Sequence, residues 1–241
     1  MNKLEEKFEL KTYQCNEFGF MKLRTLFDYF QELASDHADK LGLGYEACLE
    51  KNCAWVCAKY HVIINKLPQF KDIISIQTWP SKFSGPTGIR EFLVKDSNEN
   101  TLIKAVSQWV MIDLNRLRPT IVQNMFDCSH IKFGEDQGII LEKLSSQTET
   151  TITTQQTLRY DDVDVNHHIN NAVYIALAED NLFNNKKENI KISELSVDFK
   201  KSALLSDKQV NIKANFETNS ADFTISNQDN TTDFARINMK F

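Results

Sequence analysis

The order in which secondary-structure patterns recur is the strongest constraint on the fold of this chain. A strand pattern, a helix pattern and several further strand patterns fill the first half, and the same order returns over residues 151–239. Residues 115–149 between the two halves show neither the helical nor the strand periodicity of apolar residues. So long an irregular stretch suits a linker better than the inside of one domain. The sequence predicts an internal duplication of one α+β unit. We place the units at residues 1–118 and 151–241, with residues 119–150 as the linker.

The first half contains one long amphipathic helix among strands. Its apolar side chains recur at spacings of three and four between Leu23 and Leu41, and Gly42 is well placed to end the helix. The flanking runs are rich in β-branched and aromatic residues and are separated by turn chemistry, which is typical of antiparallel strands. We expect these strands at residues 8–14, 54–64, 72–80, 88–96 and 101–114.

The second half repeats this order in shorter form. A strand is predicted over residues 151–160 and a helix over residues 170–183, with Asn170 or Asn171 as its cap. Further strands are expected at about residues 192–199, 209–216, 221–226 and 234–239. The predicted fold class is therefore α+β, with two antiparallel sheets that each wrap one helix.

Composition excludes several classes of function. The formal net charge of −5 is unlike that of a general nucleic-acid binder, which needs a basic surface. The chain has no GxSxG nucleophile motif and no glycine-rich phosphate loop, so it predicts neither a serine hydrolase of that type nor a nucleotide cofactor. We expect no cofactor.

The cysteines and the first residues bear on the compartment. Five cysteines with no CxxC pair predict buried thiols and neither zinc ligands nor disulfides: Cys15, Cys48, Cys53, Cys57 and Cys128. The first ten residues, MNKLEEKFEL, have no apolar stretch, and no run reaches the ~20 apolar residues of a membrane span. We expect a reduced, cytoplasmic compartment without membrane contact.

One segment, residues 159–175, concentrates reactive side chains. Asp164, Asn166 and His168 stand at alternate positions, and alternate residues of an extended stretch face the same way. The carboxylate could activate water or attack directly, the imidazole could move a proton, and the amide could hold a carbonyl oxygen. One alternative is a structural helix entry rich in Asp and Asn. Another is a metal site of Asp164, His167 and His168.

At this segment the chain resembles the acyl-acyl-carrier-protein thioesterase family of plants and bacteria. The family signature Asp-x-Asn-x-His-x-Asn-Asn, followed by a Tyr-Ile helix, reads here as DVNHHINNAVYI from Asp164 to Ile175. Segments of the first half match in order as well. They are LRTLFDYFQELASDHADKLGLG, WVCAKYHVIINKLPQFKD, IQTWP, REFLVKD and SQWVMIDLNRLRP. The resemblance therefore covers nearly the whole chain.

The resemblance implies a tandem hotdog fold, in which the second unit carries the motif and the first largely shapes an acyl channel. It implies hydrolysis of fatty acyl-acyl-carrier protein, with Asp164, Asn166 and His168 as catalytic residues. The acidic carrier would need a local basic surface, for which the candidates are Lys82, Arg116, Arg118, Lys200 and Lys201. An acyl-coenzyme A thioesterase and a non-catalytic acyl-binding module are the alternatives, and a homodimer is compatible with all three.

One position departs from the family pattern. Members usually have an acidic residue after an aromatic-basic-basic run, and here the run DFKKS has Ser202 at that place. Asp198 or Glu194 could substitute only if their faces of the strand allow it.

Two histidines and one cysteine outside the motif also need an interpretation. His37 follows the apolar side of the first helix and His61 lies in a strand, so we interpret both as structural. Cys128 is followed by Ser129 and His130, but sequence neighbours do not make a catalytic dyad.

Overall fold

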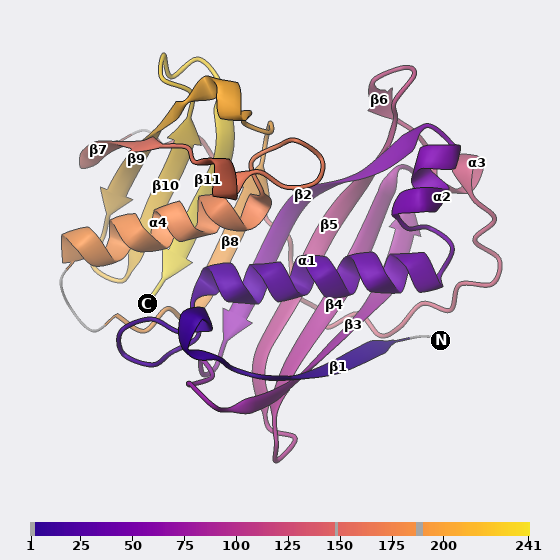
Figure 1. Cartoon of the computed structure of the whole chain (residues 1–241), viewed down its shortest axis with the longest axis horizontal. Coiled ribbons are helices and arrows are strands. Elements are labelled where there is room, and N and C mark those ends of the chain that lie inside the picture. The colour runs from indigo at the N-terminus through magenta and orange to yellow at the C-terminus, as the bar shows by residue number, and fades with distance from the viewer. Residues whose placement is uncertain (1–2, 148, 187–189) are drawn as a thin grey trace. The chain divides into compact units, whose positions relative to one another are not determined.

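The computed structural model describes residues 3–147, 149–186 and 190–241, and its chain divides into two compact units. The first comprises Met1–Met21 and Asp28–Leu141, and the second comprises Lys22–Phe27 and Glu142–Phe241. Each unit contains an antiparallel sheet crossed by one long helix (Figure 1). The predicted α+β class is confirmed. No helix in the described ranges is long and apolar enough to cross a membrane.

The first unit has a sheet in the order β1-β3-β4-β5-β2, with every neighbouring pair antiparallel. Its strands are β1 (Leu4–Glu9), β2 (Cys53–Ile64), β3 (Ile73–Ser84), β4 (Thr87–Asp96) and β5 (Thr101–Asp113), and a short β6 (Arg118–Pro119) pairs with β5. Pro80, which cannot donate to the ladder, stands where the register of β3 shifts.

Helix α1 (Leu23–Lys40) packs its apolar stripe on this sheet. The Phe30 ring stacks on Phe92 of β4 at 4.3 Å and lies 6.2 Å from Tyr60 of β2. All three side chains are fully buried, which explains why the predicted three-and-four spacing is so regular. Gly42 adopts φ +70° just after the helix, as its predicted role at the C-terminal end requires. Two short helices, α2 (Tyr45–Glu50) and α3 (Val122–Met125), complete the unit.

Residues 134–140, which we call the strap, lie on the first sheet. The strap is pinned at several points: Gly134 N–H donates to Pro80 O (2.9 Å), and Trp79 Nε1–H donates to Glu135 O (2.8 Å). Gln137 Nε2 donates to the carboxylate of Glu91 (3.2 Å), which is fully buried. Because Glu91 and Phe92 alternate along β4 and Phe92 faces α1, the strap covers the opposite face. Residues up to Leu141 thus group with the first unit, while the predicted division at residues 118 and 151 stays a prediction.

The second unit has the sheet order β8-β11-β10-β9-β7, again antiparallel throughout. Its strands are β7 (Ile152–Thr157), β8 (Glu194–Phe199), β9 (Gln209–Phe216), β10 (Ser220–Ser226) and β11 (Asp233–Lys240). Helix α4 (Asn171–Lys186) lies against β9, β10 and β11 (Figure 1). Both the helix and these strands contribute fully buried apolar side chains, among them Ile175, Ala178, Phe223 and Ile237.

The same series of elements opens both units. A strand (β1 or β7) leads to a 3-10 turn, η1 (Thr12–Gln14) or η2 (Tyr160–Asp162), then to a loop closed by an antiparallel bridge, and then to the long helix. Each element of the second series begins 148 positions after its counterpart. The predicted duplication is confirmed, with a regularity that the sequence patterns alone do not show.

The 3-10 turns correct the two predicted strands that precede the helices. Strand β1 ends at Glu9 and not near residue 14, because Gln14 Oε1 accepts the N–H of Lys11 (2.9 Å) and holds a turn. Strand β7 ends at Thr157 for the same reason, since Asp162 Oδ2 accepts the N–H of Arg159 (2.8 Å).

Candidate active site

The candidate catalytic residues lie in a tight loop between η2 and α4. We call residues 163–169 the motif loop; an antiparallel bridge between its two end residues closes it. The N–H of Asp164 donates to His168 O (2.8 Å), and the N–H of His167 donates to Asp164 O (3.0 Å). The expectation of an extended stretch with alternate residues on one face is therefore wrong. The chain turns back at His167, whose φ of +61° lies in the left-handed region.

The carboxylate of Asp164 organises this loop. Its Oδ1 accepts the N–H of Asn166 (2.9 Å) and that of His168 (3.4 Å). Such side-chain-to-backbone bonds are the turn chemistry of Asp and Asn, so the structural alternative describes this oxygen correctly. Oδ2 receives no hydrogen bond from the described part of the chain. Asp164 thus holds the loop with one oxygen, and its other oxygen has no hydrogen-bond partner among the described residues.

The side chains of Asn166 and His168 are exposed. Neither makes a side-chain hydrogen bond to another residue within the described ranges. An amide and an imidazole without protein partners are able to bind a carbonyl oxygen and to move a proton. The motif loop therefore has three polar groups without a protein partner, among the described residues, within five residues of sequence.

Helix α4 starts immediately after the motif loop. Asn170 Oδ1 accepts the N–H of Ala172 (2.8 Å), which confirms Asn170 as the predicted cap. A second anchor comes from Ala203, whose O accepts the N–H of Ile169 (3.0 Å) and whose N–H donates to Tyr174 Oη (2.9 Å). Burial raises the pKa of Tyr174 to about 12, so this phenol stays a neutral structural partner. The loop is thereby fixed to the helix that follows it.

Family models match nearly the whole chain. The acyl-ACP thioesterase N-terminal domain matches residues 1–127 and the acyl-ACP thioesterase C-terminal domain matches residues 145–241. The chain belongs to the acyl-ACP thioesterase family. Its motif loop lies within the match to the C-terminal domain of that family.

Plant members of the acyl-ACP thioesterase family are among its relatives. The chloroplastic palmitoyl-acyl carrier protein thioesterase of Arabidopsis thaliana is 30% identical over 186 residues, which cover 70% of this chain and 45% of the relative. An oleoyl-acyl carrier protein thioesterase of Coriandrum sativum is 25% identical over 190 residues, which cover 71% and 51%. The chain spans about half the length of the curated relatives it matches.

Solved structures with family names share the fold. An acyl-ACP thioesterase from Bacteroides thetaiotaomicron has a TM-score of 0.84 at 20% identity and covers 99% of this chain and 97% of its own. The 12:0-ACP thioesterase from Umbellularia californica has a TM-score of 0.80 at 19% identity, with 99% and 96% covered. At these identities the likeness shows the fold alone. The predicted tandem hotdog fold is confirmed.

Ser202, at which the sequence analysis expects this chain to depart from the family pattern, is exposed and adjoins Ala203, the backbone partner of the motif loop. The two carboxylates considered as substitutes have structural partners. Asp198 is buried, pairs with Lys200 Nζ (2.7 Å) and accepts the N–H of Leu144 (3.2 Å). Glu194 pairs with Lys240 Nζ (2.8 Å). Neither contacts the motif loop through these bonds.

Asp162 is a residue of the site region that the sequence analysis missed. Its side chain is buried, its Oδ2 accepts the Arg159 N–H, and its Oδ1 lies 3.3 Å from Arg159 Nη2 and 3.9 Å from Arg24 Nη1. Its backbone O accepts the N–H of Asn170 (2.9 Å). The pair Arg159–Asp162 is visible in the sequence at a spacing of three, but the partner Arg24 is far away in the chain.

The two histidines interpreted as structural, His37 and His61, contact other parts of the first unit. His37 is buried, and its Nδ1 lies 3.1 Å from Nη1 of Arg90, whose pKa burial lowers to about 10. His61 Nδ1 lies 2.7 Å from the O of Ile140 in the strap.

All five cysteines are unpaired thiols. Burial raises the pKa of Cys48, Cys53, Cys57 and Cys128, so these four are poor nucleophiles. His130 does not activate Cys128, because its Nε2 is directed to Leu41 O (3.0 Å). Among the described residues no group of three or more His, Cys, Asp or Glu is placed to hold a metal ion.

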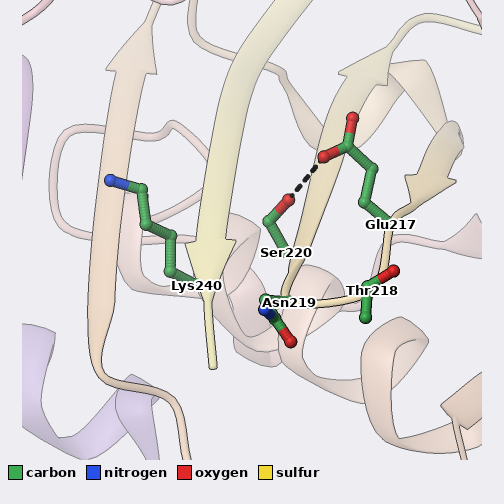
Figure 2. Close-up of a pocket in the computed structure, with 5 residues that line it drawn as sticks. All are labelled: Glu217, Thr218, Asn219, Ser220 and Lys240. Atoms are coloured by element: carbon green, nitrogen blue, oxygen red, sulfur yellow. Dashed lines mark hydrogen bonds between the residues drawn. The ribbon is translucent and has the colours of Figure 1, made fainter.

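One pocket on the surface of the second unit is a poor candidate for the chemistry. Its volume is about 630 Å³, and it lies at the turn between β9 and β10 (Figure 2). It is lined by Glu217, Thr218, Asn219, Ser220 and Lys240. Ser220 Oγ donates to Glu217 Oε2 (3.1 Å), so two of its polar groups satisfy each other. No residue of the motif loop contributes to this lining.

Proposed function

We propose that this chain hydrolyses the thioester that joins a fatty acyl chain to acyl-carrier protein. The oxygen of a water molecule bonds to the acyl carbon while the carbon–sulfur bond breaks, and the sulfur takes up a proton. The products are a free fatty acid and the carrier-protein thiol. The single observation that supports this most is the motif loop, which presents a carboxylate oxygen, an amide and an imidazole without protein partners inside the match to the C-terminal domain.

Each of the three residues has a proposed role. The side-chain amide of Asn166, together with amides at the start of α4, holds the thioester carbonyl as its oxygen gains negative charge. Oδ2 of Asp164 activates the water or attacks the acyl carbon directly. His168 moves the proton between the water and the leaving sulfur, which suits an imidazole near neutral pH.

Release of thiol, compared side by side for acyl-carrier protein and acyl-coenzyme A, tests this function. We expect hydrolysis of acyl-carrier protein with the higher kcat/KM. Faster hydrolysis of acyl-coenzyme A would instead identify a coenzyme A thioesterase on the same fold. Tight binding of both substrates without release of thiol would identify an acyl-binding module.

We also propose a cytoplasmic enzyme whose partner is the carrier protein, and we keep the homodimer as a prediction that light scattering can test. Five reduced thiols are compatible with a reducing compartment. Docking of the acidic carrier through Lys82, Arg116, Arg118, Lys200 and Lys201 belongs to the same proposal.

A further inference from the structure

The first turn of α1 makes polar contacts with the segments that flank the motif loop. Residues Lys22–Phe27 group with the second unit, although the rest of α1 groups with the first. The N–H of Leu23 donates to the carboxylate of Glu179 on α4, at 3.2 Å to Oε2 and 3.5 Å to Oε1. The next residue, Arg24, reaches Asp162 Oδ1 at 3.9 Å. One helical turn thus contacts the segment before the motif loop and the helix after it.

Asp162 transmits this contact to the motif loop by short covalent and hydrogen-bonded paths. It stands two residues before Asp164, and its backbone O accepts the N–H of Asn170, the cap of α4. Its buried carboxylate is shared between Arg24 and Arg159. A displacement of Asp162 therefore moves both ends of the motif loop.

We propose that Arg24, Asp162 and Glu179 form a clasp that positions the motif loop for thioester hydrolysis. The three are positioning residues, since they act through the loop and not on the substrate. This inference rests on the proposed function of the motif loop.

The internal duplication shows that the clasp belongs to one copy only. The counterparts of Asp162, Glu179 and Arg24, each 148 positions away, are Gln14, Gln31 and Ala172. In the first copy, Gln14 Nε2 donates to Tyr29 Oη (2.6 Å) where Asp162 meets two arginines. All three clasp residues are ionisable and all three counterparts are uncharged, although the backbones match. At these three pairs of positions, the ionisable residues therefore belong to the copy that carries the motif.

Glu179 is surrounded by groups of both charges. The charges that act on it are those of Asp180 on its own helix and Lys22 at the start of α1, and Arg159 acts in turn on Asp180. Burial raises the pKa of Glu179 to about 7, despite the hydrogen bond from Leu23. A carboxylate in such an environment destabilises the fold when it ionises, and such groups concentrate at functional sites.

Steady-state kinetics of Arg24→Gln test the ionic half of the clasp. We expect kcat to fall about 10-fold while KM changes less than twofold, because a misplaced loop impairs the chemical step more than binding. Arg236→Gln is the matched control, since Arg236 pairs with Asp233 (2.6 Å) in the same unit and its side-chain bonds go to Asp233 and Leu144, not to the motif loop. It should lower the melting temperature and leave kcat unchanged. Equal kcat values for the two variants would overturn the proposal.

Glu179→Gln and Glu179→Ala separate the acceptor from the charge. Glutamine keeps an oxygen for the N–H of Leu23 and should keep kcat within twofold, whereas alanine removes it and should lower kcat about 10-fold. A Glu179→Ala variant that is folded and fully active contradicts the clasp.

Hydrogen exchange gives a readout that needs no activity. The amides of Asn166 and His168 are held by Asp164, so Arg24→Gln should speed their exchange several-fold and Arg236→Gln should not. If the wild-type chain hydrolyses no thioester, the proposed function fails, and this exchange still decides the clasp. Unchanged exchange in Arg24→Gln overturns the clasp even in an active enzyme.

Discussion

The loop before α1 and the loop before α4 have the same pattern of backbone turns and bridges but differ in their side chains. The first runs between the bridged residues 15 and 21, and the second is the motif loop. Asn16 Oδ1 accepts the N–H groups of Phe18 (3.1 Å) and Phe20 (3.0 Å), as Asp164 Oδ1 accepts those of its own loop. Gly19, at φ +80°, takes the left-handed position that His167 takes in the motif loop. Each turn is thus held by the Oδ1 atom of the residue at the equivalent position, Asn16 or Asp164.

The difference lies in what each loop presents. Phe18 and Phe20 stand where the motif loop has Asn166 and His168, so at these two positions the first loop has no side chain that binds a carbonyl or moves a proton. Asn16 shows that an amide oxygen is sufficient to hold the turn. In the proposed function, Oδ1 of Asp164 holds the turn and Oδ2 takes part in the reaction. Replacement of Asp164 by Asn should therefore keep the turn and remove only the reactive carboxylate oxygen.

The largest expected effect comes from removing the carboxylate of Asp164, which makes the motif loop more like the first loop. Asp164→Asn should leave the loop intact, as Asn16 does in the other copy, and lower kcat by about 100-fold or more because the carboxylate is lost. His168→Ala should have an effect of similar size. Thioester hydrolysis and circular dichroism on the same preparations measure both. Asn16→Asp is the control in the first loop and should leave the rate within twofold.

Wild-type rates for Asp164→Asn and His168→Ala would remove the motif loop from the chemistry. A fall in rate for Asn16→Asp would show instead that both loops take part.

A second prediction makes the two long helices more alike. Glu179→Gln gives α4 a glutamine at the position where its counterpart α1 has Gln31. The pKa of Glu179 rises from its ordinary 4.5 to about 7 in the fold, so its contribution to stability is fully present below pH 4.5 and is lost as pH rises to about 7. We expect Glu179→Gln to stabilise the protein by about 1 kcal/mol at pH 8, which raises the melting temperature by about 3 °C.

Thermal unfolding at pH 5 and pH 8 checks the sign. The gain should be several times smaller at pH 5, where Glu179 is still protonated in the folded protein. An equal gain at both pH values would mean that ionisation of Glu179 is not its cause.

A third prediction concerns the position beside the motif loop. Ser202→Glu restores a carboxylate next to Ala203, and turnover at neutral pH should rise about fivefold if an acid there can orient water or tune His168. Since Ser202 is exposed, the added charge stays hydrated and the melting temperature should hardly change. Ser202→Ala is the control and should match the wild type. A stable Ser202→Glu variant without a gain in turnover would show that this position takes no part in the chemistry.

The smallest expected effect compares the basic side chains of the two units. Raising the salt concentration from about 50 to about 300 mM should lower kcat/KM for acyl-carrier protein about threefold, because salt screens the attraction between the acidic carrier and basic side chains. Lys200 is already paired with Asp198, whereas Lys82 and Arg118 have no ion pair within the described ranges. Lys82→Gln should therefore reduce the salt dependence more than Lys200→Gln. A rate independent of salt would contradict basic docking.

Periodicity was sufficient to predict most of this fold. The helix between Leu23 and Lys40 and strand β9 follow from spacing because each buries one regular face. The short helix α2 was not predicted, since six residues carry too little periodic signal. The sequence does predict the duplication, but the constant separation of its elements depends on turn boundaries that periodicity does not show.

The sequence proposes the residues of the candidate site but does not give the shape of the loop that holds them. Asp164, Asn166 and His168 were read as one face of an extended stretch, and the turn at His167 overrides that alternation. The Asp at the start of the loop was an available signal for a turn. The contacts of Arg24 and Glu179 could not be predicted, because they join positions more than a hundred residues apart and depend on the packing of the whole unit.

The strap has a practical consequence for anyone who divides this chain into two expression fragments. A first fragment that ends at residue 118 or 127 keeps every long strand of its sheet but loses Gln137 and the residues around it. The carboxylate of Glu91, which has no exposed surface in the whole chain, would then meet solvent together with the apolar sheet around it. Such a fragment should aggregate, whereas one that ends after Leu141 carries its own cover and should remain in solution.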